Sequence, residues 1–208
     1  MKILAHRGDW SVRGEHNSRV AFERAFDGGF GVETDVRDYC GELVISHDVP
    51  QAGAMPFREF LSIYRRYPSA GTLAVNIKAD GLQSRVKAEL AEHSVTDYFV
   101  FDMSVPDTLG YVRDGIRFFT RVSELEKTPA LYEDAAGVWL DMFFSEWADV
   151  QAMSAFLQDG KDLCIVSPEL HGRDYHAFWQ MLKVSGIDEK AGCMICTDEP
   201  GKAARYFG

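Results

Sequence analysis

The sequence predicts a single-domain α/β protein, a TIM (β/α)8 barrel that spans residues 1–208 and carries a short hairpin after its second strand. Strand-like and helix-like segments alternate along the whole chain, which implies parallel strands joined by right-handed crossovers. Eight such units can be counted, and eight suit a closed barrel. Because 208 residues are few for this architecture, the loops must be short, and a doubly wound open sheet remains the alternative.

Short apolar or alternating runs predict the strands, and a period of 3.6 residues predicts the helices. The first helix has Asn17 and Ser18 as cap candidates and ends at Gly28. A returning strand follows the turn at Gly41. The eight strands of the barrel are expected at 2–7, 31–37, 72–78, 97–103, 117–122, 137–143, 162–169 and 192–198. Helices are expected at 17–29, 56–67, 82–93, 106–114, 148–160, 174–186 and 200–207, with one more after 117–122.

The charge balance excludes one large class of partners. The net charge is −10, whereas a nucleic-acid-binding protein needs a basic surface. No window approaches 18 continuous apolar residues, so no stable membrane insertion is expected. The first ten residues show neither a long apolar stretch nor a cleavage site, and the expectation is therefore a cytoplasmic protein.

Two of the four cysteines form the string "CMIC", which invites a metal or redox interpretation. The string lies in a predicted strand, where Cys193 and Cys196 point to opposite faces. No second pair with this spacing exists, and we expect buried structural thiols.

The segment "GVETDVRDY" raises the question of function, because charged residues occupy every second position. A strand has period two, so Glu33 and Asp35 share one face. An edge strand with a solvated side would show the same pattern. In a barrel, however, this face points to the axis, and two carboxylates about 4 Å apart repel by roughly 4 kcal/mol at an effective dielectric near 20. They then need a proton, a basic side chain or a cation, and oxygen ligands suit Mg²⁺ or Ca²⁺.

Polar residues recur at the carboxyl ends of the predicted strands, where barrels carry their sites. Asp198 could equally cap the last helix. If the hairpin turns around Cys40, His47 falls opposite Glu33 and becomes an acid–base candidate. The residues at these ends are His6, Arg7, Glu33, Asp35, Asn76, Lys78, Asp102, Arg121, Asp141, Glu169 and Asp198.

Six ordered motifs resemble those of the glycerophosphodiester phosphodiesterase family: "AHRG" (5–8), "NS" with "AF" (17–22), "ETDV" (33–36), "GELVISHD" (41–48), "NIK" (76–78) and "CTDEP" (196–200). The resemblance is tightest over residues 5–48 and implies a TIM barrel. It implies a phosphoric diester hydrolase that uses a divalent metal, Mg²⁺ or Ca²⁺, on a small anionic phosphodiester, as in lipid metabolism. By this resemblance His6 and His47 are catalytic, and Arg7 and Lys78 bind the substrate phosphate. Glu33 and Asp35 match two of the metal ligands.

The sequence departs from the family pattern at the third metal ligand, where Asn76 replaces a glutamate. An amide oxygen can bind a cation but brings no charge, so Glu169, Asp102 or Asp141 would have to compensate. The glutamate of the family's ENT motif is displaced to Glu15, and the stretch from 35 to 76 is short. We therefore expect an atypical member. A phosphodiester lyase that forms a cyclic phosphate and a non-catalytic phosphoester-binding protein are the alternatives.

Overall fold

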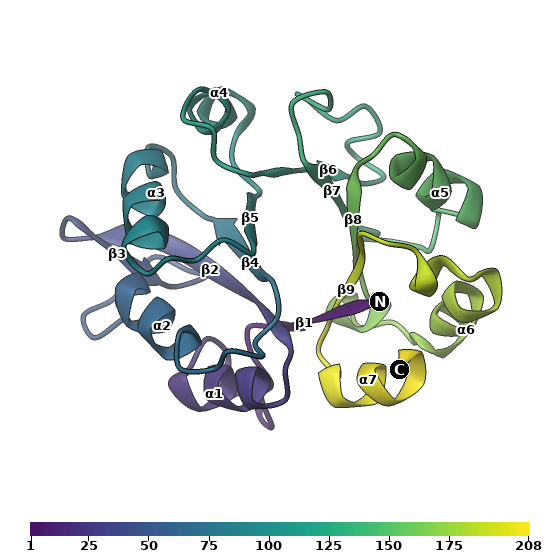
Figure 1. Ribbon diagram of the computed structural model, residues 1–208, viewed down its shortest axis with the longest axis horizontal. Coiled ribbons are helices and arrows are strands. Elements are labelled where there is room, and N and C mark those ends of the chain that lie inside the picture. The colour runs from purple at the N-terminus through teal and green to yellow at the C-terminus, as the bar shows by residue number, and fades with distance from the viewer.

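The computed structural model describes residues 1–208 and shows eight parallel strands surrounded by seven α-helices (Figure 1). Hydrogen-bonded neighbours follow the order β5-β4-β2-β1-β9-β8-β7-β6, and β3 pairs with β2 off this path. The barrel strands are β1 (Lys2–His6), β2 (Gly31–Tyr39), β4 (Leu73–Ile77), β5 (Tyr98–Phe101), β6 (Phe119–Val122), β7 (Gly137–Leu140), β8 (Asp162–Val166) and β9 (Cys193–Thr197).

The two ends of this sheet meet and nearly close the barrel. Val100 of β5 forms a parallel bridge with Phe118, next to β6, and its N–H donates to Arg117 O at 3.0 Å. An open doubly wound sheet would leave these two edges apart. The barrel prediction is therefore confirmed, and the β5–β6 junction is its weakest seam because it consists of one bridge.

The helices cover the outside of the barrel, and three of them begin at a side-chain cap, of which Ser18 is the one that the sequence predicts. Ser18, Ser104 and Asp149 each accept a hydrogen bond from a backbone N–H in the first turn of a helix. The helices are α1 (Arg19–Asp27), α2 (Phe57–Tyr64), α3 (Gln83–Glu92), α4 (Val105–Arg113), α5 (Val150–Gln158), α6 (His176–Ser185) and α7 (Pro200–Phe207).

The helix expected after β6 does not form. Residues 123–136 are turns instead, and this loop occupies the space between α4 and α5 (Figure 1). Ser123 Oγ accepts from the backbone N–H of Glu126 at 3.2 Å, which favours a tight turn over a helix. Thr120 Oγ1 then ties Ala130 O back to the strand at 2.9 Å, and Pro129 disfavours helical backbone before it.

The apolar core has an inner and an outer part. Inside the barrel, Phe99 stacks on Phe119 with ring centroids 3.7 Å apart, and Phe101 stacks on Trp139 at 4.0 Å. Outside, two larger clusters fill the space between strands and helices, one under α1 to α4 and one under α5 to α7. These four aromatic rings fill the interior of the barrel, so a ligand can bind only at its mouth.

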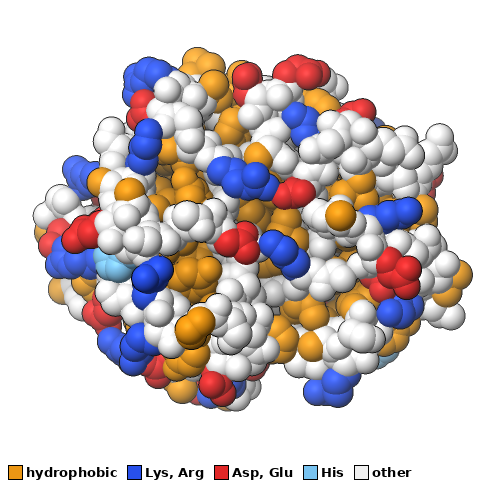
Figure 2. Space-filling view, viewed as in Figure 1, with side chains coloured by type: hydrophobic (Ala, Val, Ile, Leu, Met, Phe, Trp, Pro, Cys, Tyr) orange, Lys and Arg blue, Asp and Glu red, His pale blue; other side chains and the backbone are white.

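The thiols of Cys193 and Cys196 are buried and free, as the strand pattern predicts, whereas Cys40 is exposed. Cys193 packs in the outer cluster and Cys196 in the inner one, so the two point to opposite faces of β9. Figure 2 shows a face on which acidic and basic side chains are interspersed, without a continuous basic patch. None of the helices combines the length and the apolar character needed to cross a bilayer.

The hairpin after β2 turns at Cys40 and Gly41, both with positive φ, and returns as β3 (Glu42–Ile45). Val36 pairs with Ile45 and Tyr39 with Glu42, a register set by the two-residue turn. Continued outward, this register sets His47 level with Thr34 and not with Glu33. The expectation that His47 lies opposite Glu33 is therefore wrong by one residue, which reverses the face.

Candidate active site

The end of β1 brings His6 and Arg7 to the carboxyl mouth of the barrel. Arg7 has φ 56°, a left-handed conformation that is uncommon for residues other than glycine, and Gly8 has φ 89°. A Cβ on Gly8 would lie 2.8 Å from Ala21 of α1, so only glycine fits there. The turn lets two consecutive polar side chains point into the mouth, and backbone strain of this kind is typical of functional sites.

His6 lies between two carboxylates. Its Nδ1 is 2.7 Å from Asp198 Oδ1, at the end of β9, and its Nε2 is 3.9 Å from Glu33 Oε2. A carboxylate only accepts hydrogen bonds, so Asp198 holds the proton on Nδ1 and orients the ring. The Nε2 atom is then directed to the mouth, where it can accept or donate a proton. Trp10 Nε1 donates to His6 O at 3.1 Å and fixes the backbone.

His6 and Glu33 both hold their protons more tightly than usual. Burial lowers the pKa of His6, but the hydrogen bond to Asp198 and the charges of Glu33 and Asp198 outweigh it and raise the pKa overall. Burial, followed by the negative charge of Asp35, raises the pKa of Glu33 to about 7. On the inward face of β2, an ionised Glu33 carboxylate therefore destabilises the folded protein unless a cation binds beside it.

Asp35 is completely buried and surrounded by positive and amide groups. Asn17 Nδ2 donates to Asp35 Oδ2 at 2.9 Å. Arg7 Nε lies 3.1 Å from the same oxygen, but its N–H is not directed at it, so this contact is an ion pair. Lys78 Nζ is 3.4 Å from Asp35 Oδ1. The inward direction of Glu33 and Asp35 that the period predicts is thus what the fold produces.

Three buried oxygens in this region lack a hydrogen-bond partner: Glu33 Oε2, Asp35 Oδ1 and Asn76 Oδ1. Asp35 pairs directly with Asn76 in the parallel register of β2 and β4. Unpaired buried acceptors are costly, and two carboxylates with an amide form the hard oxygen set that Mg²⁺ and Ca²⁺ prefer. The donor set fits a divalent cation, although no three His, Cys, Asp or Glu side chains converge into a complete metal site.

Lys78 connects this group to the next strands. Its Nζ is 3.9 Å from Asp102 Oδ2, and Asp102 Oδ1 is 3.3 Å from Arg121 Nη1. Asp102 has φ 68°, and burial raises its pKa despite the nearby cations Arg121 and Lys78. Arg121 Nε also donates to Glu126 Oε2 at 2.5 Å. A row of alternating charges therefore runs along the mouth from β2 to β6.

The other side of the mouth is internally satisfied. His171 Nε2 donates to Asp141 Oδ1 at 2.7 Å. Glu169 accepts from the Ser167 and Thr197 hydroxyls and from the Asp198 N–H. Since these bonds occupy both of its carboxylate oxygens, Glu169 has little left with which to compensate for Asn76.

His47 lies apart from this group. It makes no hydrogen bond or ion pair with His6 or Glu33, and 45% of its side chain is exposed. Its Nδ1 is 2.9 Å from Asp48 Oδ1, and its carbonyl accepts from Arg37 Nε. The hydrogen bond with His47 is the main cause that lowers the pKa of Asp48. The backbone N–H of Ser46, which precedes His47, donates to Asp35 O at 3.0 Å, so this loop lies next to the mouth. The structure places His47 at the rim.

Sequence reasoning left the role of Asp198 open and missed that of Asn17. Asp198, a strand-end residue that could equally have been a cap, is the partner of His6 and not a cap, since α7 begins after Glu199 without a side-chain cap. Asn17 does not cap α1 either; it bridges Thr34 Oγ1 and Asp35. Its φ of 56° turns the side chain inward. His16 also lies beside His6, with ring centroids 6.2 Å apart. An asparagine before a helix is usually a cap, and no local signal contradicted that interpretation.

The sequence matches no protein-family model and no curated protein sequence. Solved structures are similar over nearly the whole chain. A glycerophosphodiester phosphodiesterase from Agrobacterium tumefaciens superposes with a TM-score of 0.73 at 18% identity, covering 99% of both chains. A phosphodiesterase from Oleispira antarctica, in complex with the product sn-glycerol-3-phosphate, gives 0.69 at 17% identity over 99% of this chain and 96% of that one.

A more distant enzyme shares the same architecture. The Ca²⁺-dependent phosphatidylinositol-specific phospholipase C of Streptomyces antibioticus gives a TM-score of 0.61 at 11% identity, covering 100% of this chain and 96% of that one. These similarities establish the fold that the sequence motifs implied.

Proposed function

We propose that the protein is a metal-assisted phosphodiester hydrolase that acts on a glycerophosphodiester or a related small phosphodiester. One observation carries the proposal: three buried oxygens at the ends of β2 and β4 lack a hydrogen-bond partner, and they lie beside the oriented His6 ring and the basic side chains of Arg7 and Lys78. The resemblance of the motifs and the printed activities of structurally similar proteins support the same substrate class.

The residues that would hold a divalent cation are Glu33, Asp35 and Asn76, through the oxygens that lack partners. When bound, such a cation supplies Lewis-acid stabilisation of charge on a phosphoryl oxygen. Two carboxylates and a neutral amide carry less charge than three carboxylates, so we expect weaker affinity for the cation than Glu at position 76 would give.

The remaining chemistry belongs to side chains of the chain itself. Arg7 and Lys78 hold the phosphate, and both are already positioned by Asp35. His6 exchanges a proton at Nε2, while Asp198 keeps the other proton on Nδ1 and stabilises the imidazolium. His47 at the rim is the second acid–base candidate, and closure of its exposed loop over a bound substrate would bring it to the phosphate.

A cleavage assay on glycerophosphodiesters with Mg²⁺, Ca²⁺ or EDTA tests this proposal. We expect turnover that is lost in EDTA and restored by one of the two cations. Binding of the cation has a second readout, since it should raise the melting temperature of the wild type but not of Glu33→Gln. Metal-independent turnover, or no stabilisation by either cation, would reject the metal site.

The first product distinguishes hydrolysis from a cyclising reaction. If a neighbouring substrate hydroxyl attacks, a cyclic phosphate accumulates and is visible by phosphorus NMR before any monoester. The neutral Asn76 favours a further hypothesis, in which the protein binds phosphoesters without cleaving them because its metal site is weakened. Calorimetric binding of a phosphodiester without turnover under any of these cations would favour it.

A further inference from the structure

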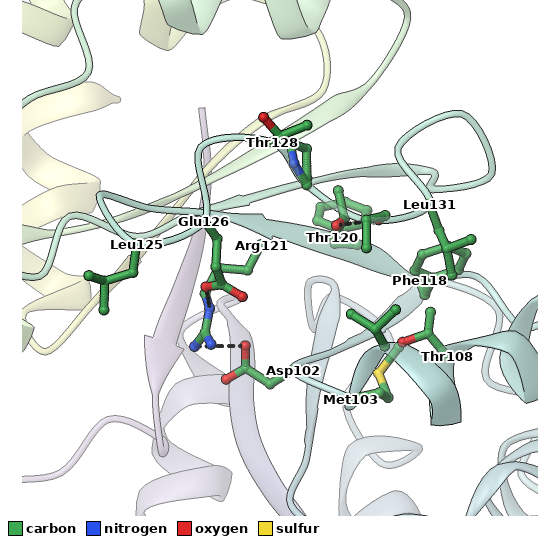
Figure 3. Close-up of a pocket in the computed structure, with 14 residues that line it drawn as sticks. Asp102, Met103, Thr108, Phe118, Thr120, Arg121, Leu125, Glu126, Thr128 and Leu131 are labelled. Atoms are coloured by element: carbon green, nitrogen blue, oxygen red, sulfur yellow. Dashed lines mark hydrogen bonds and ion pairs between the residues drawn. The ribbon is translucent and has the colours of Figure 1, made fainter.

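A cavity of about 250 Å³ lies at the seam where β5 and β6 meet. It is enclosed by the start of α4 and by the loop that replaces the helix after β6, so it exists because that helix is missing. In Figure 3, Thr108, Phe118 and Leu131 lie at one end of the cavity, and Asp102, Arg121 and Glu126 lie between them and Leu125.

The cavity adjoins the candidate active site. A second hollow is lined by Lys78 and shares Asp102, Arg121 and Glu126 with the first. Lys78 is also within 3.4 Å of Asp35, at the centre of the charged group. The two adjoining hollows, together called the groove, therefore extend from the proposed phosphate-binding lysine to the β5–β6 seam.

The cavity contains one basic side chain, and it is already paired. Arg121 lies between Asp102 on one side and Glu126 on the other. The hydroxyls of Thr108 and Thr120 donate to the backbone carbonyls of Ser104 and Ala130. Half of the 14 lining residues are hydrophobic, among them Met103, Phe118 and Leu131 at the floor of the groove.

Two exposed apolar side chains flank the groove. Val105 is 56% and Leu125 is 73% exposed, although large apolar groups are normally shielded from water. The carboxylates of Asp80, Asp102 and Glu126 would repel an anionic head group, whereas an apolar body would cover Val105, Leu125 and the apolar lining together.

We infer that this groove binds one alcohol substituent of the phosphodiester, and that the substituent presents an apolar alkyl or aryl group to it. The inference rests on the proposed function, because the phosphate is placed at Arg7 and Lys78. The groove then acts as the specificity-determining site: the phosphate is held at the mouth while the apolar substituent lies over the β5–β6 seam.

Three diesters of sn-glycerol 3-phosphate test the inference, with methanol, 1-hexanol or benzyl alcohol as the second alcohol, so that every leaving group is an alkoxide. We expect kcat/KM for the hexyl and benzyl esters to exceed that for the methyl ester by about tenfold or more, the discrimination that one or two buried methylenes provide. The variant Ala130→Phe fills the groove and should reduce this ratio to about one while leaving the methyl ester within about twofold. Ala130 is an exposed lining residue, so the fold should tolerate the change.

The matched control is Ala191→Phe, which makes the same substitution beside an unrelated hollow next to α5. It should keep the wild-type preference. Leu131→Ala, which enlarges the floor, gives a second test and should weaken the hexyl preference. Equal kcat/KM for all three esters in the wild type, or an unchanged ratio in both cavity variants, would overturn the inference.

A binding experiment separates this inference from the proposed function. If none of the esters is cleaved, the hydrolase proposal fails. Calorimetric titration of the wild type with the hexyl and methyl esters then tests, independently of turnover, whether the groove binds an apolar substituent. Tighter binding of the hexyl ester, lost in Ala130→Phe, supports the groove, and equal binding of both esters rejects it.

Discussion

The two sides of the barrel mouth differ in how their polar groups are satisfied. On the side formed by β1, β2 and β4, buried atoms of Arg7, Glu33, Asp35 and Asn76 lack hydrogen-bond partners. On the side formed by β7, β8 and β9, the carboxylates are paired: Asp141 with His171, and Glu169 with two hydroxyls and a backbone N–H.

Both sides bury carboxylates at strand ends, so sequence position does not distinguish them. The difference teaches that burial of charge alone is not a sign of function. A carboxylate whose oxygens already accept hydrogen bonds gains little from binding a ligand. A buried oxygen without a hydrogen-bond partner destabilises the fold until a ligand supplies one. His6 joins the two sides, since it contacts Glu33 on one and Asp198 on the other.

The largest expected effect sharpens this comparison at β2. Glu33→Gln and Asp35→Asn should each lower kcat/KM for phosphodiester cleavage by about 10³-fold, because each removes a charged cation ligand and, at position 35, the partner of Arg7 and Lys78. Steady-state kinetics at saturating Mg²⁺ or Ca²⁺ measures this loss. The matched control is Asp141→Asn, another buried strand-end carboxylate, which should stay within about fivefold. Equal losses in all three would remove the distinction between the two sides.

His6→Asn should lower activity by 10²-fold or more, the scale of a general acid–base group. Asp198→Asn should lower the activity less and move the pH–rate profile to lower pH, because the raised pKa of His6 depends on Asp198.

His47→Asn tests the second histidine, with a loss of activity of about 10²-fold expected if its loop closes over substrate. The exposed His176→Asn serves as the control. Full activity in His6→Asn would reject its role.

The pH dependence of stability should follow Glu33 when divalent cations are absent. Its folded pKa of about 7 lies above the ordinary 4.5, so the folded state binds the proton more tightly than the unfolded state does. Stability from this group should be present below pH 4.5 and fall as the pH rises to about 7, by on the order of 2–3 kcal/mol.

Urea unfolding in EDTA at pH 5 and pH 8 measures this difference. Glu33→Gln should be less sensitive to pH than the wild type, and Asp9→Asn, which removes a less buried acid whose pKa burial also raises, should change the sensitivity less. A wild-type protein that is more stable at pH 8 than at pH 5 would show that Glu33 is ionised at low cost.

The smallest effect is expected on the satisfied side of the mouth. His171→Ala leaves the buried Asp141 carboxylate without its partner and should cost about 1–3 kcal/mol of stability. Activity should change by less than about fivefold. Chemical denaturation and kinetics on the same preparation compare the two outcomes. A large loss of activity without loss of stability would place His171 in the chemistry and end the contrast between the sides.

Local patterns were enough to predict the barrel and its inward carboxylates. The alternation of strands and helices, and the period of two through Glu33 and Asp35, are properties of neighbouring residues. They also predicted the strand-end positions of His6, Arg7 and Lys78. The hairpin register was predicted wrongly by one residue, so His47 does not share the face of Glu33. The turn type sets this pairing, and the strand pattern does not.

The amino-acid sequence by itself determined the order of the elements and which side of each strand is polar. Only the tertiary structure decided that Asp198 meets His6 across 192 residues, that Asn17 turns inward to Asp35, and that a cavity opens where the helix after β6 is absent. The physical reason is that side-chain direction follows from local geometry, whereas contact between distant strand ends exists only once the barrel has closed.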